Sequence, residues 1–233
     1  MRGIAVVFCI SILLPGCSSS SEVQISDQSY FPLRVGNFRI YQVNARDILR
    51  LKCDDIGETL KTYQLKELVS DSAKNVEGGY TYTIHHYTRP DSTHPWVDLE
   101  TWTARTNSNQ VVVNESNIPY VKFIFPLVEK TVWNINSYNS LRKDYDTLRN
   151  LHQSFVLNNG NIVQNTFSAR RDSVDLILYY YRRKEVYAPS IGLIYKEDTQ
   201  LQYFDNSDFS CYGQQVAKSG STYVQSLISY GHQ

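Results

Sequence analysis

Short segments of the chain alternate between hydrophobic and polar residues, a pattern typical of strands with one buried face. The alternation is clearest in residues 80–84 (YTYTI) and 121–125 (VKFIF), and it is looser in residues 38–43, 60–69 and 96–103. A period of two places successive side chains on opposite faces of a strand. The pattern therefore predicts several amphipathic strands along the chain.

Turn signals separate these segments. Gly78 and Gly79 precede one predicted strand, Pro90 ends another, and the Asn159-Gly160 pair is the sharpest hairpin signal. These signals lie between the alternating segments, as expected for strands that pair in chain order.

Residues 187–195 (YAPSIGLIY) combine two apolar segments with a proline and a glycine between them. We interpret this stretch as a strand end, a proline-led turn and a second strand. We expect Gly192 to adopt a backbone conformation that a residue with a Cβ enters only at a cost.

Residues 141–151 contain the one hint of a helix. Leu141, Tyr145 and Leu148 lie at positions i, i+4 and i+7, although Asp144 and Asp146 disfavour a helix interior. With 18 Tyr, 9 Phe and 3 Trp, the composition favours strands. The sequence predicts a mainly β, single-domain antiparallel meander that forms a barrel or half-barrel, with at most this short helix.

The N-terminus has the layout of a secretory signal. Arg2 supplies a positive charge, and residues 4–14 form an apolar run that is too short to span a bilayer. The run ends in LLPGC, and Leu14, Gly16 and Cys17 match the Leu-x-Gly-Cys pattern of the bacterial lipobox. This resemblance implies that residues 1–16 are removed and that Cys17 is lipidated.

The domain boundaries and the location follow from this reading. Residues 17–26, which begin with Cys17 and four consecutive serines, form a lipidated tether, and residues 27–233 form the β domain. Several acyl chains on Cys17 would hold the protein at a membrane, so we expect a lipid-anchored protein of the cell envelope, at the outer membrane.

Charge and cysteine content constrain the partners. The chain has 23 basic and 23 acidic side chains and a formal net charge of +0, which argues against nucleic acid as a partner. Cys53 and Cys211 remain in a compartment that permits disulfides. They can form a disulfide or stay as two separate thiols, and the sequence leaves both alternatives open.

Three groups of residues resemble a known family. They are YFPLRVGN at residues 30–37, FPL at 125–127 with WNIN at 133–136, and EVYA at 185–188 with IGLIYKE at 191–197. The chain resembles an uncharacterised lipoprotein family of Bacteroidota, and this resemblance implies a location but no activity. Ile135 and Ser190 stand where that family usually or often has glycine.

The only cluster with metal-ligand chemistry begins at His85 and His86 and continues to Glu100. Adjacent strand residues point to opposite faces, so we expect no shared metal ion and no cofactor. The chain has no Gly-x-Ser-x-Gly, no His-Glu-x-x-His and no Gly-rich phosphate loop. We therefore expect a protein that is not an enzyme.

Residues 179–184 (YYYRRK) have the texture of a ligand-binding surface. Alternation places Tyr180, Arg182 and Lys184 on one face of a strand, which makes them candidates for contact with a glycan. An alternating strand whose aromatic residues serve the core is the commoner cause of such a run.

These observations favour a structural or binding lipoprotein of the envelope, with a lipid, a glycan or another envelope protein as its partner. An aromatic-rich meander that encloses a pocket would instead suit a carrier of a lipid or small apolar ligand. A hydrolase with an unrecognised site is the weakest alternative.

We predict that Cys17→Ser prevents lipidation and cleavage before residue 17, because a hydroxyl cannot replace the thiolate nucleophile in thioether formation. Incorporation of labelled palmitate measures this directly, with Cys53→Ser as the control that keeps the lipobox. Equal incorporation by the Cys17→Ser variant and the parent would refute the prediction.

Overall fold

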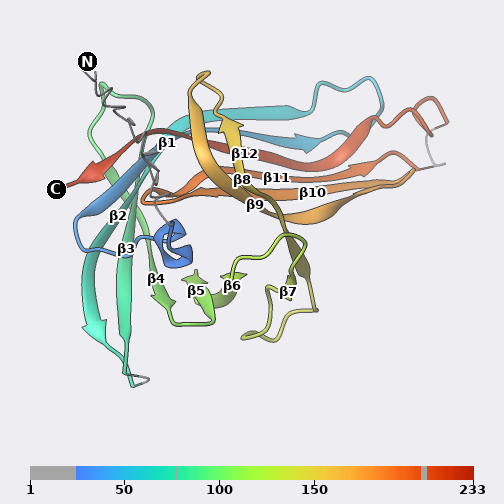
Figure 1. The fold of residues 1–233 in the computed structure, drawn as a ribbon. Coiled ribbons are helices and arrows are strands. Elements are labelled where there is room, and N and C mark those ends of the chain that lie inside the picture. The colour runs from blue at the N-terminus through green and yellow to red at the C-terminus, as the bar shows by residue number, and fades with distance from the viewer. Residues whose placement is uncertain (1–24, 77, 206–208) are drawn as a thin grey trace, which may run out of the picture.

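The computed structural model describes residues 25–76, 78–205 and 209–233. Cys17 and residues 1–16 lie outside this range, so the predicted lipidation site has no structural description. A 3-10 helix, η1 (Asp27–Tyr30), precedes twelve strands (Figure 1). The strands are β1 (Asn37–Leu49), β2 (Glu58–Lys74), β3 (Tyr80–Arg89), β4 (Val97–Thr106), β5 (Gln110–Glu115), β6 (Ile118–Ile124), β7 (Val132–Asn134), β8 (Tyr145–Val156), β9 (Ile162–Asp175), β10 (Tyr179–Ala188), β11 (Gly192–Tyr203) and β12 (Ala217–His232).

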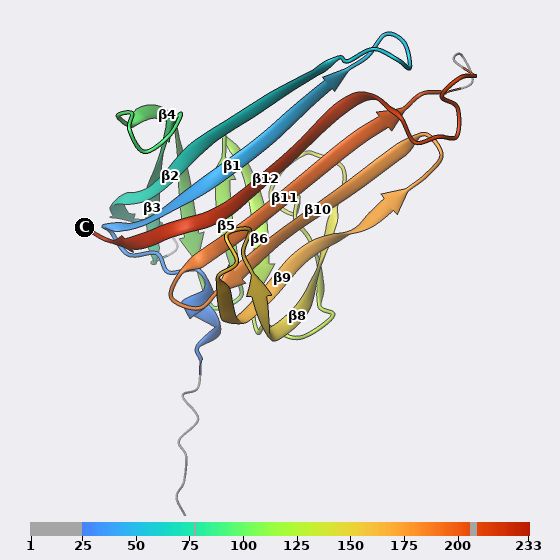
Figure 2. The same ribbon diagram turned by 90° about the horizontal axis from the view of Figure 1, so that it is seen from above.

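All the strands belong to one antiparallel sheet in the order β6-β5-β4-β3-β2-β1-β12-β11-β10-β9-β8-β7. The chain forms two meanders, β1 to β6 and β7 to β12, which are joined where the first strand pairs with the last. Figure 2 shows the long strands β2, β1, β12, β11 and β10 side by side as one broad layer. Sequential hairpins are the connections that the turn signals predict.

The two edges of the sheet approach each other. The Val121 amide of β6 donates to the Ile135 carbonyl beyond β7 at 2.9 Å, and Trp133 Nε1 donates to the Val121 carbonyl at 3.1 Å. These bonds cover part of both edge strands, which would otherwise expose unpaired backbone groups. The sheet is thus a nearly closed barrel, and the predicted fold class is confirmed.

The main hydrophobic core fills one part of the barrel and is rich in aromatic rings. The ring centroid of Phe123 lies 5.1 Å from that of Phe167 and 4.9 Å from that of Tyr187. Tyr30 of η1 packs on Phe167 at 5.1 Å, and its hydroxyl donates to the Asn165 carbonyl at 2.6 Å. The 3-10 helix is therefore held to β9 by both packing and a hydrogen bond.

A second hydrophobic cluster involves the ends of β8 and β9. Leu157, Phe155 and Val163 pack with Val186 of β10 and Leu227 of β12. Register shifts interrupt the β8–β9 pairing between residues 149 and 155. Such irregularities bend strands, and here they accompany the packing of this hairpin against neighbouring strands.

The prediction of a helix at residues 141–151 is wrong. Residues 145–151 belong to β8, which pairs with β7 and β9, and residues 141–144 form no helix. Leu148 is buried, whereas Leu141 and Tyr145 are both 49% exposed. The three residues therefore do not share one buried face, and pairing on both sides of the strand decides the local structure.

Cys53 and Cys211 form a disulfide, with their Cα atoms 5.7 Å apart and 158 positions between them in the sequence. The bridge joins the β1–β2 connection to the β11–β12 connection. Of the two alternatives that the sequence leaves open, the structure contains the bridged one.

The turn between β10 and β11 contains two residues with positive φ. Gly192 has φ +91°, as the sequence predicts, and Ser190 has φ +63°. A Cβ on Gly192 would lie 2.8 Å from Arg39 Nη1 and 3.3 Å from Pro32 Cδ. Ser190 thus occupies a backbone conformation that glycine adopts at little cost.

We predict that Gly192→Val lowers the free energy of unfolding by about 1 to 3 kcal/mol, because valine adds both backbone strain and a clash with Arg39. Gly160→Val is the matched control, since Gly160 has φ +85° but nothing within 4 Å of an added Cβ. Urea denaturation should show a larger loss for Gly192→Val than for Gly160→Val. Equal losses would mean that the contact with Arg39 adds no strain.

Candidate functional site

A polar pocket of about 290 Å³ lies between the two meanders. Strands β5 and β6 contribute one side, β10 and β11 another, and the segment from Ile135 to β8 contributes the rest. Its lining contains five carboxylates and three basic groups: Glu115, Asp144, Asp146, Glu185 and Asp198, and Lys122, Arg183 and Lys196. Most ligand pockets are largely apolar, so this charge density is unusual.

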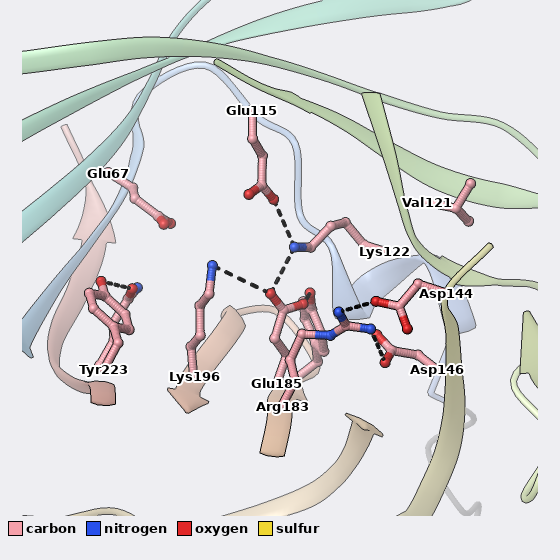
Figure 3. A network of polar contacts seen from close by, with 12 residues as sticks. Glu67, Glu115, Val121, Lys122, Asp144, Asp146, Arg183, Glu185, Lys196 and Tyr223 are labelled. Atoms are coloured by element: carbon pink, nitrogen blue, oxygen red, sulfur yellow. Dashed lines mark hydrogen bonds and ion pairs between the residues drawn. The ribbon is translucent and has the colours of Figure 1, made fainter. Parts of the chain in front are cut away.

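Lys122 lies at the centre of the network in Figure 3. Its Nζ is 2.8 Å from Glu115 Oε1 and 2.7 Å from Glu185 Oε1, and Lys196 Nζ is 3.8 Å from the same Glu185 oxygen. The Tyr187 hydroxyl donates to Glu185 Oε2 at 2.5 Å. One ammonium therefore links β5 and β6 to β10 across the interior.

A second group of ion pairs surrounds Arg183 of β10. Its Nη1 is 2.7 Å from Asp144 Oδ2, and its Nη2 is 2.7 Å from Asp146 Oδ1 (Figure 3). Arg171 Nε lies 3.4 Å from the other Asp144 oxygen. Two carboxylates on one guanidinium fix the direction of Arg183, because its donors have a rigid planar arrangement.

A smaller recess of about 40 Å³ adjoins this pocket and shares four lining residues with it: Glu115, Lys122, Glu185 and Lys196. In the recess, Arg39 Nε donates to Glu67 Oε2 at 2.9 Å, and the Tyr41 hydroxyl donates to the same oxygen at 3.0 Å. Arg39 and Tyr41 belong to β1 and Glu67 to the neighbouring β2, where Glu67 lies directly opposite Arg39.

His86 and Trp102 complete the recess. Their ring centroids lie 4.2 Å apart, and His86 is only 2% exposed. His86 Nε2 is 3.6 Å from Glu67 Oε1, beyond hydrogen-bond distance. Among the described residues, neither His86 nitrogen nor Trp102 Nε1 has a hydrogen-bond partner, although all three atoms are buried.

Burial and neighbouring charges act in opposite directions on the carboxyl groups. Burial alone would raise the pKa of Glu185, but Lys122 and Lys196 lower this pKa to about 2. Burial raises the pKa of Asp146, although Arg183 opposes that change. Glu185 is therefore ionised at neutral pH, because the positive charges of Lys122 and Lys196 stabilise its carboxylate form.

The sequence-predicted candidates lie elsewhere. Arg182 pairs with Glu197 at 3.3 Å, and Lys184 Nζ lies over the rings of Phe155 and Tyr195 at 4.7 and 5.8 Å. Tyr180 packs against a separate small cluster of β1, β11 and β12 residues. Tyr180, Arg182 and Lys184 are absent from the pocket lining, whereas the intervening Arg183 belongs to it.

The histidine group is also dispersed. His86 is buried in the recess, while His85 stacks on Tyr87 at 6.1 Å and His94 pairs with Asp91 in the β3–β4 connection. Within residues 25–76, 78–205 and 209–233, no three His, Cys, Asp or Glu side chains are arranged to hold a metal ion. The structure therefore brings only His86 of this group to the pocket region.

Sequence reasoning missed the pocket residues because they come from six separate segments. One signal was available: alternation in β10 places Tyr181, Arg183, Glu185 and Tyr187 on a single face. Two charged residues between aromatic ones on a buried face indicate an internal polar site, since buried charges require partners.

No protein-family model matches the chain, and no curated protein matches it. Among solved structures, the chain is similar to a protein of Bacteroides fragilis that is described as a proposed exported protein with a YmcC-like fold. The two are 11% identical, the match covers 86% of this chain and 98% of the other, and the TM-score is 0.33. A likeness of this size carries no argument about function. In the described part of the chain, no helix has the length and apolar character needed to cross a membrane.

We predict that Glu185 makes the protein sensitive to acid. Its folded-state pKa of about 2 is below the unfolded value of about 4.3, so its stabilising contribution is present above pH 4.3 and is lost as the pH falls towards 2. Glu185→Gln should be less stable than the parent at pH 7 and should lose less of its remaining stability between pH 5 and 3.

Urea denaturation at several pH values measures both effects. Asp47→Asn is the control, because the Asp47–Lys61 pair is exposed and solvent screens it. Identical pH slopes for the parent and Glu185→Gln would contradict the assignment.

Proposed function

We propose that this protein is a lipid-anchored protein of the cell envelope that binds a small polar ligand in its central pocket without catalysing a reaction. The lipobox pattern at Cys17 supports the anchor, and the serine-containing segment after it supplies a tether. Membership in the resembled Bacteroidota lipoprotein family belongs to the same proposal.

The observation that carries the binding proposal is the ionic lining of the pocket. Removing an ionised side chain from water is costly unless it is paired and hydrogen-bonded, and a hydrocarbon ligand would replace water without supplying hydrogen bonds. A polar ligand can form hydrogen bonds with these side chains in place of the water that it displaces. The lining therefore supports a polar ligand over the lipid or apolar ligand of a carrier.

A hydrolase has less support from the same geometry. Glu115 and Glu185 both contact Lys122 Nζ, so Lys122 occupies the space between the two carboxylates. The low pKa of Glu185 leaves it without a proton to donate near neutral pH, whereas glycoside hydrolysis requires one carboxylic acid as a proton donor.

The proposal predicts that a polar solute stabilises the parent and that blocking the pocket abolishes this effect. Gln200→Trp places a large side chain at an exposed position of the pocket lining and leaves the ion pairs of Lys122 and Arg183 in place. Gln164→Trp is the matched control, at an exposed position of β9 outside this pocket.

Thermal unfolding of the detergent-purified protein would be measured with amino acids, monosaccharides, nucleosides and fatty acids. We expect a polar class to raise the Tm of the parent and of Gln164→Trp but not of Gln200→Trp. Stabilisation by fatty acids alone, or a lipid retained in native mass spectra, would favour the carrier instead. No stabilisation by any class would favour a structural role.

A further inference from the structure

The recess beside the pocket contains hydrogen-bonding atoms that the protein itself does not use. Trp102 Nε1 and His86 Nδ1 are buried without a hydrogen-bond partner among the described residues, His86 Nε2 has only Glu67 Oε1 at 3.6 Å, and both side chains line the recess. A buried polar atom left unpaired costs about 1 to 3 kcal/mol, so native proteins satisfy nearly all of them with protein, water or ligand. These atoms therefore mark a place for an external polar group.

The types of these atoms restrict the chemistry of that group. An indole N–H can only donate, whereas a neutral imidazole has one donor and one acceptor nitrogen. An ammonium group could serve the imidazole acceptor but not the donor of Trp102. A hydroxyl both donates and accepts, so it can satisfy Trp102 and His86 together.

The charges lead to the same class. The recess lining holds three carboxylates, Glu67, Glu115 and Glu185, and three cations, Arg39, Lys122 and Lys196, which pair with one another. The adjoining pocket has two more carboxylates than basic groups. The carboxylate excess, with every cation of the described recess lining already paired, argues against an anionic ligand, and the Trp102 N–H, which a cationic donor cannot satisfy, argues against a cationic one; a neutral ligand remains.

Size and surface character add a third constraint. The recess of about 40 Å³ admits a group of a few atoms, whereas the adjoining pocket of about 290 Å³ is close to the lower limit of ordinary ligand pockets. Phe31, Trp102 and Tyr187 also line the recess and provide aromatic surface beside the polar atoms. A compact ring with hydroxyl substituents fits this combination.

We propose that the polar ligand is a neutral saccharide, whose ring occupies the larger pocket and one of whose hydroxyl groups enters the recess beside the contacting rings of Trp102 and His86. This inference rests on the proposed binding function and adds the ligand class and the contact residues. Lys122 and Glu185 lie where the two cavities meet, so their ion pair would adjoin both parts of the ligand.

The test uses the mature lipidated protein in detergent. Neutral mono- and disaccharides would be titrated at millimolar concentration by calorimetry, beside glucuronate as an anionic probe and lysine as a cationic probe. Trp102→Phe removes the indole N–H and keeps an aromatic ring. Trp96→Phe is the matched control, because Trp96 stacks on Arg89 at 4.1 Å and does not line the pocket or the recess.

We expect a neutral saccharide to bind the parent, and we expect Trp102→Phe to weaken that binding at least tenfold while Trp96→Phe leaves it unchanged. The indole ¹⁵N–H resonance of Trp102 in the parent should also shift during the titration. This second measurement decides the matter if Trp102→Phe does not fold.

Two results would overturn the saccharide inference and leave the binding function intact. In the first, glucuronate or lysine binds, Gln200→Trp blocks this binding, and no neutral saccharide binds. In the second, a saccharide binds, but Trp102→Phe does not weaken its affinity and the indole resonance of Trp102 does not shift. Absence of binding by every probe would overturn the proposed function as well.

Discussion

The position of the Lys122 ammonium between Glu115 and Glu185 is the constraint on which the interior of this barrel depends. The edges of the sheet meet through only a few hydrogen bonds, so the two meanders need other contacts to hold their separation. Lys122 Nζ lies within 2.8 Å of both carboxylates and joins β5 and β6 to β10. Without it, buried Glu185 and partly buried Glu115 would lie close together with no common cation, and their repulsion would favour opening the seam.

Stability alone does not account for a charged interior. A buried ion pair can often be replaced by hydrophobic residues of similar volume with no loss of stability, because desolvation offsets the attraction. The aromatic cluster around Phe123 shows that this barrel packs an apolar core in another part of its interior. The contrast between that core and the ionic network beside it is the physical basis for placing a polar ligand in the pocket.

The sequence predicts more of the fold than of the candidate site. Alternation and turn signals indicate an antiparallel meander because both act locally, as at Gly192, where φ is positive. The helical spacing of Leu141, Tyr145 and Leu148 led to a wrong prediction. Residues 145–151 form a strand because β8 pairs with β7 on one side and β9 on the other, and these pairings override a short helical pattern. Glu115, Lys122 and Glu185 meet only through the closure of the barrel, and no local pattern specifies which charges face one another across it. Strand β10 illustrates this limit: alternation separates Arg182 from Arg183, and the position of Arg183 and Glu185 between two tyrosines is the only local sign that their face borders the pocket.

A double-mutant cycle on Lys122 and Glu185 measures how strongly this ion pair couples the two sides of the barrel, with Lys122→Met, Glu185→Gln and the double variant compared by urea denaturation at pH 7. We expect Lys122→Met alone to lower the free energy of unfolding by about 3 to 5 kcal/mol, because it leaves buried Glu185 and partly buried Glu115 without their common cation. Glu185→Gln should then cost at least about 1 kcal/mol less in the Lys122→Met background than in the parent. Additive effects of the two substitutions would contradict the claim that this ion pair holds the two sides of the barrel together.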